Sequence, residues 1–218
     1  MIIKSLSRKD ASFAQLAKYI ERGAADGIDR LYQHLYARHI DPVVARFEAN
    51  GGCMRKRTNG VMLYHEVISI TRAQALDVAT QKKLLFDIAD RYIQTRAPQC
   101  LVFGALHEDK AHSLHFHLMI SANIKDTGKR HRLTKAEFLK IQRDCEQRVL
   151  DQHPELEQSR VIGKPSRAKQ SSKAYWQERR TGELPGRSSF AERLAQVFTM
   201  ALNEADLDRL AKEARVEL

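Results

Sequence analysis

The strongest constraint on the fold of this chain is a histidine-rich stretch, residues 101–121, which predicts a β-hairpin. Two apolar runs within it are joined by a polar, charged turn. Because side chains alternate between the faces of a strand, His115 and His117 project from one face, about 7 Å apart along the backbone, and Phe116 from the other. An antiparallel return brings His107, at the end of the first run, toward this pair.

Three converging imidazoles that leave coordination positions open are typical of a catalytic divalent metal site and not of a closed structural one. Four of the nine histidines fall within the eleven residues 107–117, together with Glu108 and Asp109. The alternative is a solvated turn beside a half-exposed strand, without a metal. The density of histidine favours the metal site.

The composition excludes several classes of protein. The 218 residues are 43% hydrophobic, enough for a substantial core, yet no apolar run is long enough to span a bilayer. The first residues form no secretion signal, and the three scattered cysteines match no metal-binding spacing. We therefore expect a cytoplasmic protein without membrane insertion. A net charge of +10 points to a polyanionic partner.

The remaining periodicities predict an α+β fold, with helices set beside a small antiparallel sheet. Asp10 to Ser12 offer an N-cap to a helix that contains Tyr19, and the residues Thr134 to Glu137 form a capping box. Helices packed on one side of the sheet leave the histidine face open. The expected elements are a strand over 1–6, a helix from 13, a partly helical segment over 28–50, a strand over 61–70, and helices over 71–95 and 134–152.

A change in composition after Pro154 marks a second region. Residues 160–187 hold eight Lys or Arg against two acids, and their main aromatic feature is the pair Tyr175 and Trp176. This pattern predicts a basic helical arm. We expect one main domain over 1–155 and a basic helical extension over 156–218.

Three motifs together resemble the relaxases of conjugative and mobilisable plasmids, and within them the MOBP class. The motifs are LAKYIER around Tyr19, the strand YHEVISI, and the hairpin HEDKAHSLHFH. These relaxases belong to the His-hydrophobe-His single-strand endonucleases, which share a ferredoxin-like sheet of five antiparallel strands. The resemblance covers about residues 1–150 and implies nicking of one DNA strand at an origin of transfer in the bacterial cytoplasm. It also implies that 1–155 is the nickase domain and that 156–218 is its DNA-gripping extension.

The resemblance also implies roles for particular residues. Tyr19 is the expected nucleophile, which forms a 5′-phosphotyrosyl link, and Mg²⁺ or Mn²⁺ is the expected cofactor. The spacing between Asp109 and the first histidine of the His-x-His pair is one residue longer than the family pattern, so the third metal ligand is either His107 or His112. The expected ligands are His107, His115 and His117, with His112, Asp109, Glu66 and His65 as alternative ligands or as residues that orient a ligand.

Basic residues outside the hairpin are expected to bind phosphates of single-stranded DNA at the origin. Accessory relaxosome proteins and a type IV secretion coupling protein are the further expected partners. The alternatives are a replication initiator or transposase of the same endonuclease group, or a basic DNA-binding module with a structural ion. The expected DNA-binding residues are Arg22, Arg55, Lys56, Arg57, Lys164, Arg167, Lys169, Lys173, Arg179 and Arg180.

The chemistry sets one geometric expectation. A nucleophile about 3 Å from phosphorus, and a metal about 2 Å from an oxygen of the same phosphate, must lie close together. We therefore expect the hydroxyl of Tyr19 within roughly 5–8 Å of the point where His107, His115 and His117 converge.

Overall fold

The computed structural model describes residues 1–23, 30–53, 59–162, 180, 197, 209 and 210. The chain divides into two compact units, Met1–Lys164 and Pro165–Leu218, and the elements below belong to the first. The predicted basic arm lies almost wholly outside the described residues. In chain order the elements are β1 (Ile2–Arg8), α1 (Phe13–Arg22), β2 (Arg30–Gln33), α2 (Ile40–Gly52), β3 (Leu63–Thr71), α3 (Val78–Arg96), β4 (Cys100–Lys110), β5 (Ser113–Ile124), α4 (Lys135–Gln152) and a 3-10 turn (Pro154–Leu156).

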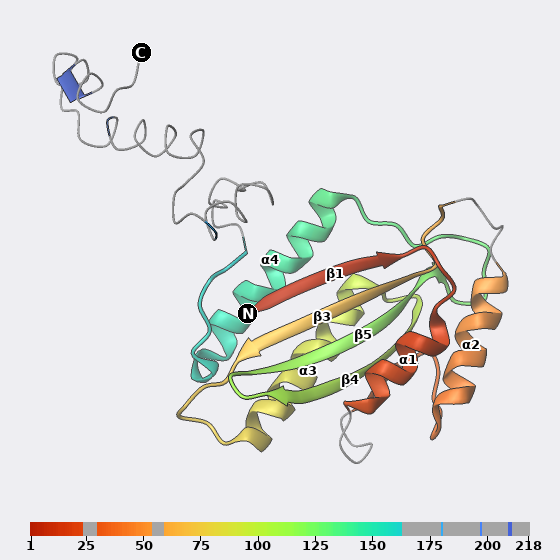
Figure 1. Ribbon diagram of the computed structural model, residues 1–218, viewed down its shortest axis with the longest axis horizontal. Helices are drawn as coiled ribbons and strands as arrows, with labels where there is room; N and C mark the ends of the chain where they lie inside the picture. Colours follow the sequence, from red (N-terminus) through yellow and green to blue (C-terminus); the bar gives the residue numbers. More distant parts are fainter. Residues whose placement is uncertain (24–29, 54–58, 163–179, 181–196, 198–208, 211–218) are drawn as a thin grey trace. The chain divides into compact units, whose positions relative to one another are not determined.

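The strands form one five-stranded sheet in the order β1-β3-β5-β4-β2, and every neighbouring pair is antiparallel (Figure 1). The predicted hairpin of β4 and β5 lies inside this sheet, flanked by β3 and β2. The expectation of an α+β fold built on about five antiparallel strands is therefore confirmed. No described helix is both long enough and apolar enough to cross a membrane.

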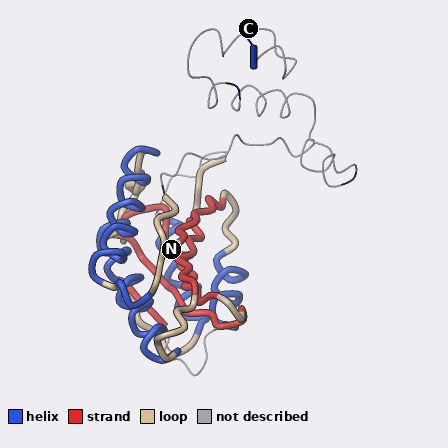
Figure 2. Tube along the Cα trace, turned by 90° about the vertical axis from the view of Figure 1, so that its left-hand side faces the viewer, coloured by secondary structure: helices blue, strands red, loops and turns tan. Residues whose placement is uncertain are grey.

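Helices cover both faces of the sheet, and not one face as the sequence suggested (Figure 2). Leu114, Phe116 and Leu118 of β5 project toward α3 and belong to the larger apolar cluster. Met119 projects the other way and packs with residues of α1 and α2, among them Phe47. The alternation predicted for β5 is thus correct, and α1 and α2 pack on the same face as the imidazoles.

Two element boundaries differ from the expectation. Residues 30–33, expected in a helix, form the edge strand β2, in which Leu31 and Gln33 are buried and pair with β4. The helix expected from residue 71 begins at Val78, because β3 continues to Thr71 and Asp77 caps the helix through the amide of Thr80. The capping box predicted at the start of α4 is present.

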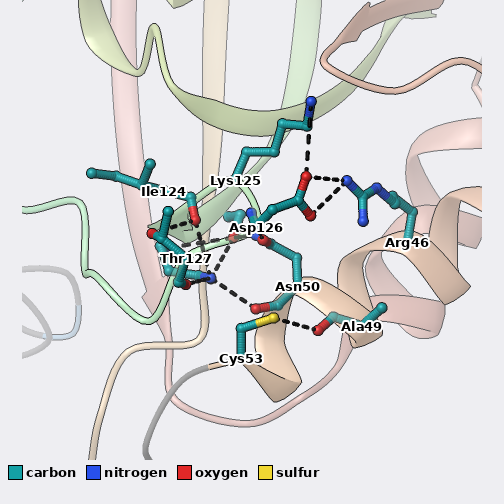
Figure 3. Close-up of polar contacts among 10 residues, drawn as sticks. Arg46, Ala49, Asn50, Cys53, Ile124, Lys125, Asp126 and Thr127 are labelled. Carbon is teal, nitrogen blue, oxygen red and sulfur yellow. Dashed lines mark hydrogen bonds and ion pairs between the residues drawn. The ribbon is translucent and has the colours of Figure 1, made fainter.

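A buried polar network fastens α2 to the turn that follows β5 (Figure 3). The amide of Asn50 donates to the hydroxyl of Ser121, and its side-chain oxygen accepts from the backbone N–H of Asp126. Asn123 donates to the carbonyl of Asn50, and at the exposed edge of the network Arg46 pairs with Asp126 at 2.7 Å. Buried polar groups are costly unless they are bonded, so this satisfied network fixes α2 against the sheet.

Candidate active site

Three histidines of the hairpin converge on one side of the sheet. His107 of β4 lies directly opposite His115 of β5, and His117 follows two residues further on the same face. Each offers a ring nitrogen, and these atoms lie within 4.8 Å of one another. The rings are almost fully buried, with 4–5% of each residue exposed. This spacing is compatible with a single divalent ion bound by three imidazoles.

The hairpin is one residue longer between Asp109 and His115 than the family pattern, and an irregularity in the pairing of β4 accommodates this residue. His107 pairs with His115, but Lys110 pairs with Ser113, so β4 has one more residue than β5 over this interval. His112 is exposed at the turn and lies outside the cluster. The structure therefore brings together His107, and not His112, with the His-x-His pair.

Each of the three rings has one nitrogen held by a partner, which leaves the other nitrogen available. Nε2 of His107 donates to the carbonyl of Ile20 at 2.8 Å, and Nε2 of His115 lies 3.0 Å from a carboxylate oxygen of Asp109. In a neutral imidazole whose Nε2 carries the proton, Nδ1 is the lone-pair nitrogen. The buried Nδ1 of His115 has no hydrogen-bond partner within the described part of the chain.

His117 is held by a fourth imidazole. Nδ1 of His117 lies 2.9 Å from Nε2 of His65, and the buried Nε2 of His117 has no partner among the described residues. Metal-binding histidines commonly have one nitrogen oriented by such a partner. The arrangement fits a divalent cation, because the buried Nδ1 of His115 and Nε2 of His117 have no hydrogen-bond partner within the described part of the chain, and all three rings offer a nitrogen to one point.

Burial favours the neutral, metal-binding form of His65, His115 and His117, because it lowers the pKa of each. Loss of hydration lowers the pKa of His117 to about 3, helped by the nearby charge of His107. Burial, then the charge of Arg8, lower the pKa of His65 to about 4. Burial also lowers the pKa of His115, which Asp109 opposes.

Glu66 does not take part in this cluster. It follows His65 on β3 and therefore points to the opposite face, where it is fully buried. There it accepts hydrogen bonds from Tyr92 at 2.6 Å and from Ser5 at 2.9 Å, and it pairs with Arg96 at 2.8 Å. The hypothesis that Glu66 orients a metal ligand is wrong, and its role is to link β3 to α3.

Tyr19 extends from α1 over the imidazoles. Its ring centroid lies 5.2 Å from that of His117, 5.6 Å from that of His107 and 6.0 Å from that of His65. The apolar side of α1 packs on the sheet and brings the helix to this position, while Tyr19 stays 44% exposed. Two segments separated by 87 residues thus meet through the bond between His107 and Ile20.

Gly23, directly after α1, lies against the ring of His107. A Cβ built there would lie 2.3–2.4 Å from three atoms of the His107 ring. Only a residue without a side chain leaves room for the imidazole, so the end of α1 and His107 fit against each other. The sequence indicated only that Gly23 ends the helix, and this steric requirement was not predicted.

Few of the predicted DNA-binding residues can be placed. Arg22 is exposed one turn from Tyr19, and Arg180 is an exposed helical residue of the second unit. Sequence reasoning missed Arg8 and Lys110, whose charges act on the imidazole cluster. The others lie outside the described residues: Arg55, Lys56, Arg57, Lys164, Arg167, Lys169, Lys173 and Arg179.

Comparison with known proteins identifies the class. A family model for the MobA/VirD2-like relaxase nuclease domain matches residues 19–153, well over half of the chain. The chain therefore belongs to this relaxase family and is a DNA-nicking enzyme. No curated protein matches the sequence.

Solved relaxase structures share the fold. The MobM relaxase domain (MOBV) bound to plasmid pMV158 oriT DNA, with manganese, is 14% identical in two crystal structures. At pH 4.6 the match covers 81% of this chain and 98% of that chain with a TM-score of 0.52, and at pH 6.8 it covers 83% and 98% with a TM-score of 0.53. The same domain with a 26-nucleotide oriT DNA is 16% identical over 77% of this chain and 95% of that chain, with a TM-score of 0.51. The MOBP class stays a prediction.

Proposed function

We propose that this relaxase nicks one DNA strand at a plasmid origin of transfer, with Tyr19 as the nucleophile and a divalent cation held by His107, His115 and His117. The observation that carries the proposal is the position of Tyr19, an exposed tyrosine whose ring lies against the imidazoles of the cluster. Manganese and oriT DNA in the similar MobM structures support Mn²⁺ or Mg²⁺ and an origin substrate.

A bound cation would act as a Lewis acid on a non-bridging oxygen of the scissile phosphate. The hydroxyl oxygen of Tyr19 attacks phosphorus and the bond to the 3′ oxygen breaks. The phenol loses one proton overall and the released 3′ oxygen gains one. Because one phosphodiester bond replaces another, the 5′-phosphotyrosyl link retains the energy needed to rejoin the strand.

The chain's own residues prepare this reaction in three ways. His65 and Asp109 hold the rings of His117 and His115, and burial keeps those rings neutral. The bond between His107 and Ile20 fixes α1, and with it Tyr19, beside the cluster. Exposure of Tyr19 leaves its ring accessible to a bound strand.

We extend the proposal to the wider setting of the reaction. The enzyme acts in the bacterial cytoplasm, where accessory relaxosome proteins and a type IV secretion coupling protein are its expected partners. The residues 160–187 bind phosphates of the single strand. Their deletion should therefore reduce the steep salt dependence of DNA affinity, by about 0.7 in log–log slope for each phosphate that is no longer bound.

A covalent-adduct assay tests the nucleophile. Labelled single-stranded origin DNA is incubated with protein and Mn²⁺ and resolved on a denaturing gel. Tyr19→Phe removes one oxygen, so the adduct should disappear while DNA affinity is retained. Tyr36→Phe, at an 81% exposed tyrosine, is the matched control and should form adduct normally. An adduct formed by Tyr19→Phe would exclude Tyr19 as the nucleophile.

Manganese titration tests the ligands. His107→Ala should abolish cleavage and weaken Mn²⁺ binding by orders of magnitude, because the ion keeps only two of its three imidazoles. His112→Ala should change neither, since His112 lies outside the cluster. Full nicking by a His115→Ala, His117→Ala double variant in excess chelator would eliminate the metal mechanism.

A further inference from the structure

The face of the sheet that carries the imidazoles continues onto the edge strand β1. Ile2 lies opposite Ser69 on β3, and Ser69 lies opposite His115. In the next row Lys4 lies opposite Val67, and Val67 opposite His117. Residues directly opposite each other across an antiparallel pair project to the same face.

A third row joins β1 to the fourth imidazole, because Leu6 lies opposite His65. The side chains that β1 adds to this face therefore alternate between apolar and basic: Ile2, Lys4, Leu6 and Arg8. A solvated face of an edge strand normally carries polar and charged side chains, so the two apolar members, Ile2 and Leu6, are the feature that needs an explanation.

The β1 part of this face is open at Ile2, Lys4 and Leu6, whereas Arg8 is half-buried and its Nη1 donates to the hydroxyl of Ser12 at 3.4 Å. Ile2 is 43% exposed and Leu6 58% exposed, and Lys4 is exposed as well. By contrast, the part of the same face over β4 is covered, where Leu101 and Phe103 are fully or almost fully buried in the cluster formed with α1 and α2. Large apolar side chains exposed beside cations, at the border of a catalytic site, mark a surface for a ligand with apolar and anionic parts.

We propose that Ile2, Lys4, Leu6 and Arg8 form a nucleotide platform, on which the single strand leaving the scissile phosphate lies. This inference rests on the proposed function. Bases cover Ile2 and Leu6, and the phosphates pair with Lys4 and Arg8. β1 lies two strand spacings from β5, a distance of about 10 Å. About three stacked nucleotides would span this distance between the imidazole cluster and β1.

Two features favour single-stranded DNA over another occupant. The platform is continuous with the imidazole cluster through the three cross-strand rows, so a strand held at the cluster needs no turn to reach it. Its charge is complementary to a phosphate backbone, because Lys4 and Arg8 are its ionisable groups. A second copy of this chain would bring the same basic residues together across a twofold interface.

The test measures binding of short and long oligothymidylates by fluorescence anisotropy over a salt series, in chelator so that no metal contributes. The variant Lys4→Gln, Leu6→Ser is compared with Leu139→Ser, Lys140→Gln. The control pair removes the same two residue types from α4, where Leu139 is 37% exposed and Lys140 is exposed.

The platform variant should bind the long oligothymidylate with a log–log salt slope reduced by about 0.7, because one phosphate fewer is neutralised. Removal of on the order of 40 Å² of buried apolar area at Leu6 should weaken binding by a further factor of about five. The control should bind as the unmodified protein does. Lys4→Gln alone, at an exposed side chain, should show the slope change without altering the fold.

The outcomes separate this inference from the proposed function. If the platform variant binds and nicks as the unmodified protein does, the platform is wrong and the relaxase mechanism stands. A change in oligomeric state with unchanged DNA affinity would identify the face as a contact between copies and overturn the inference. If the unmodified protein neither binds oligothymidylate nor forms an adduct with origin DNA, both proposals fall.

Discussion

Replacement of Gly23 by Ala should uncouple the nucleophile helix from the metal site. The new Cβ would lie 2.4 Å from Nε2 of His107, whereas ordinary contacts begin near 3.4 Å, so the ring must move by about 1 Å. The backbone itself accepts Ala, because φ at Gly23 is −87°. The strain therefore falls on His107 and on its bond to Ile20.

The size of this shift decides the effect on the metal. Coordination distances vary by about 0.2 Å, so a ligand displaced by about 1 Å no longer binds in place. We expect Mn²⁺ affinity to fall by about 10- to 100-fold, the range found when groups that orient metal ligands are changed. Overpacking should also destabilise the fold by about 1–3 kcal/mol.

Isothermal titration with Mn²⁺, thermal unfolding and the adduct assay measure these effects. Gly52→Ala is the control, because a Cβ at Gly52, the last residue of α2, would meet no atom of the described residues within 4 Å. It should retain Mn²⁺ affinity and nicking. If Gly23→Ala also keeps both at the unmodified level, His107 does not lie against Gly23 in the metal-bound protein, and the coupling is refuted.

Three further predictions address the groups around the cluster. Glu66→Ala should destabilise the fold by about 3–5 kcal/mol in denaturant unfolding, because it leaves the buried charge of Arg96 unpaired; a cost below about 1 kcal/mol would contradict this. His65→Ala should weaken Mn²⁺ binding about 10- to 100-fold with little change in oligothymidylate binding, since His117 loses the partner that orients it; unchanged affinity would refute that role. A hydrogen bond from Arg46 lowers the pKa of Asp126. The stability that this pair adds is therefore present above the unfolded pKa of about 3.9 and is lost as the pH falls through the folded value. Asp126→Asn should reduce the dependence of unfolding free energy on pH in this acidic range at low salt, and an identical pH profile would show that the pair contributes nothing.

Much of the sheet could be predicted because its central strands carry strong alternation. On β5 the apolar residues Leu114, Phe116 and Leu118 face one helical layer and the histidines face the other, so period two is unambiguous. The strand β2 could not be predicted, because Leu31 and Leu35 are four residues apart and imitate a helical stripe. Only its pairing with β4, a contact distant in sequence, makes it a strand.

The same alternation of side chains along a strand made part of the candidate site predictable. Alternation alone placed His115 and His117 on one face, and it placed His65 and Glu66 on opposite faces of their strand. Which of these two meets the cluster depends on the register between β3 and β5, which pairs His65 with Met119. Local sequence contains no information on that register, nor on the irregularity in β4 that selects His107.

The hydrogen bond between His107 and Ile20 couples the position of α1 to the binding of the cation. Any cation that prefers the orientation of His107 found here also prefers the position of α1 that supplies the accepting carbonyl. By reciprocity, whatever holds α1 in place must raise the affinity for the cation by the same factor. DNA that restrains Tyr19 would therefore raise the affinity for the cation through α1, in addition to any direct contact between the cation and the scissile phosphate, and the two should bind with positive cooperativity.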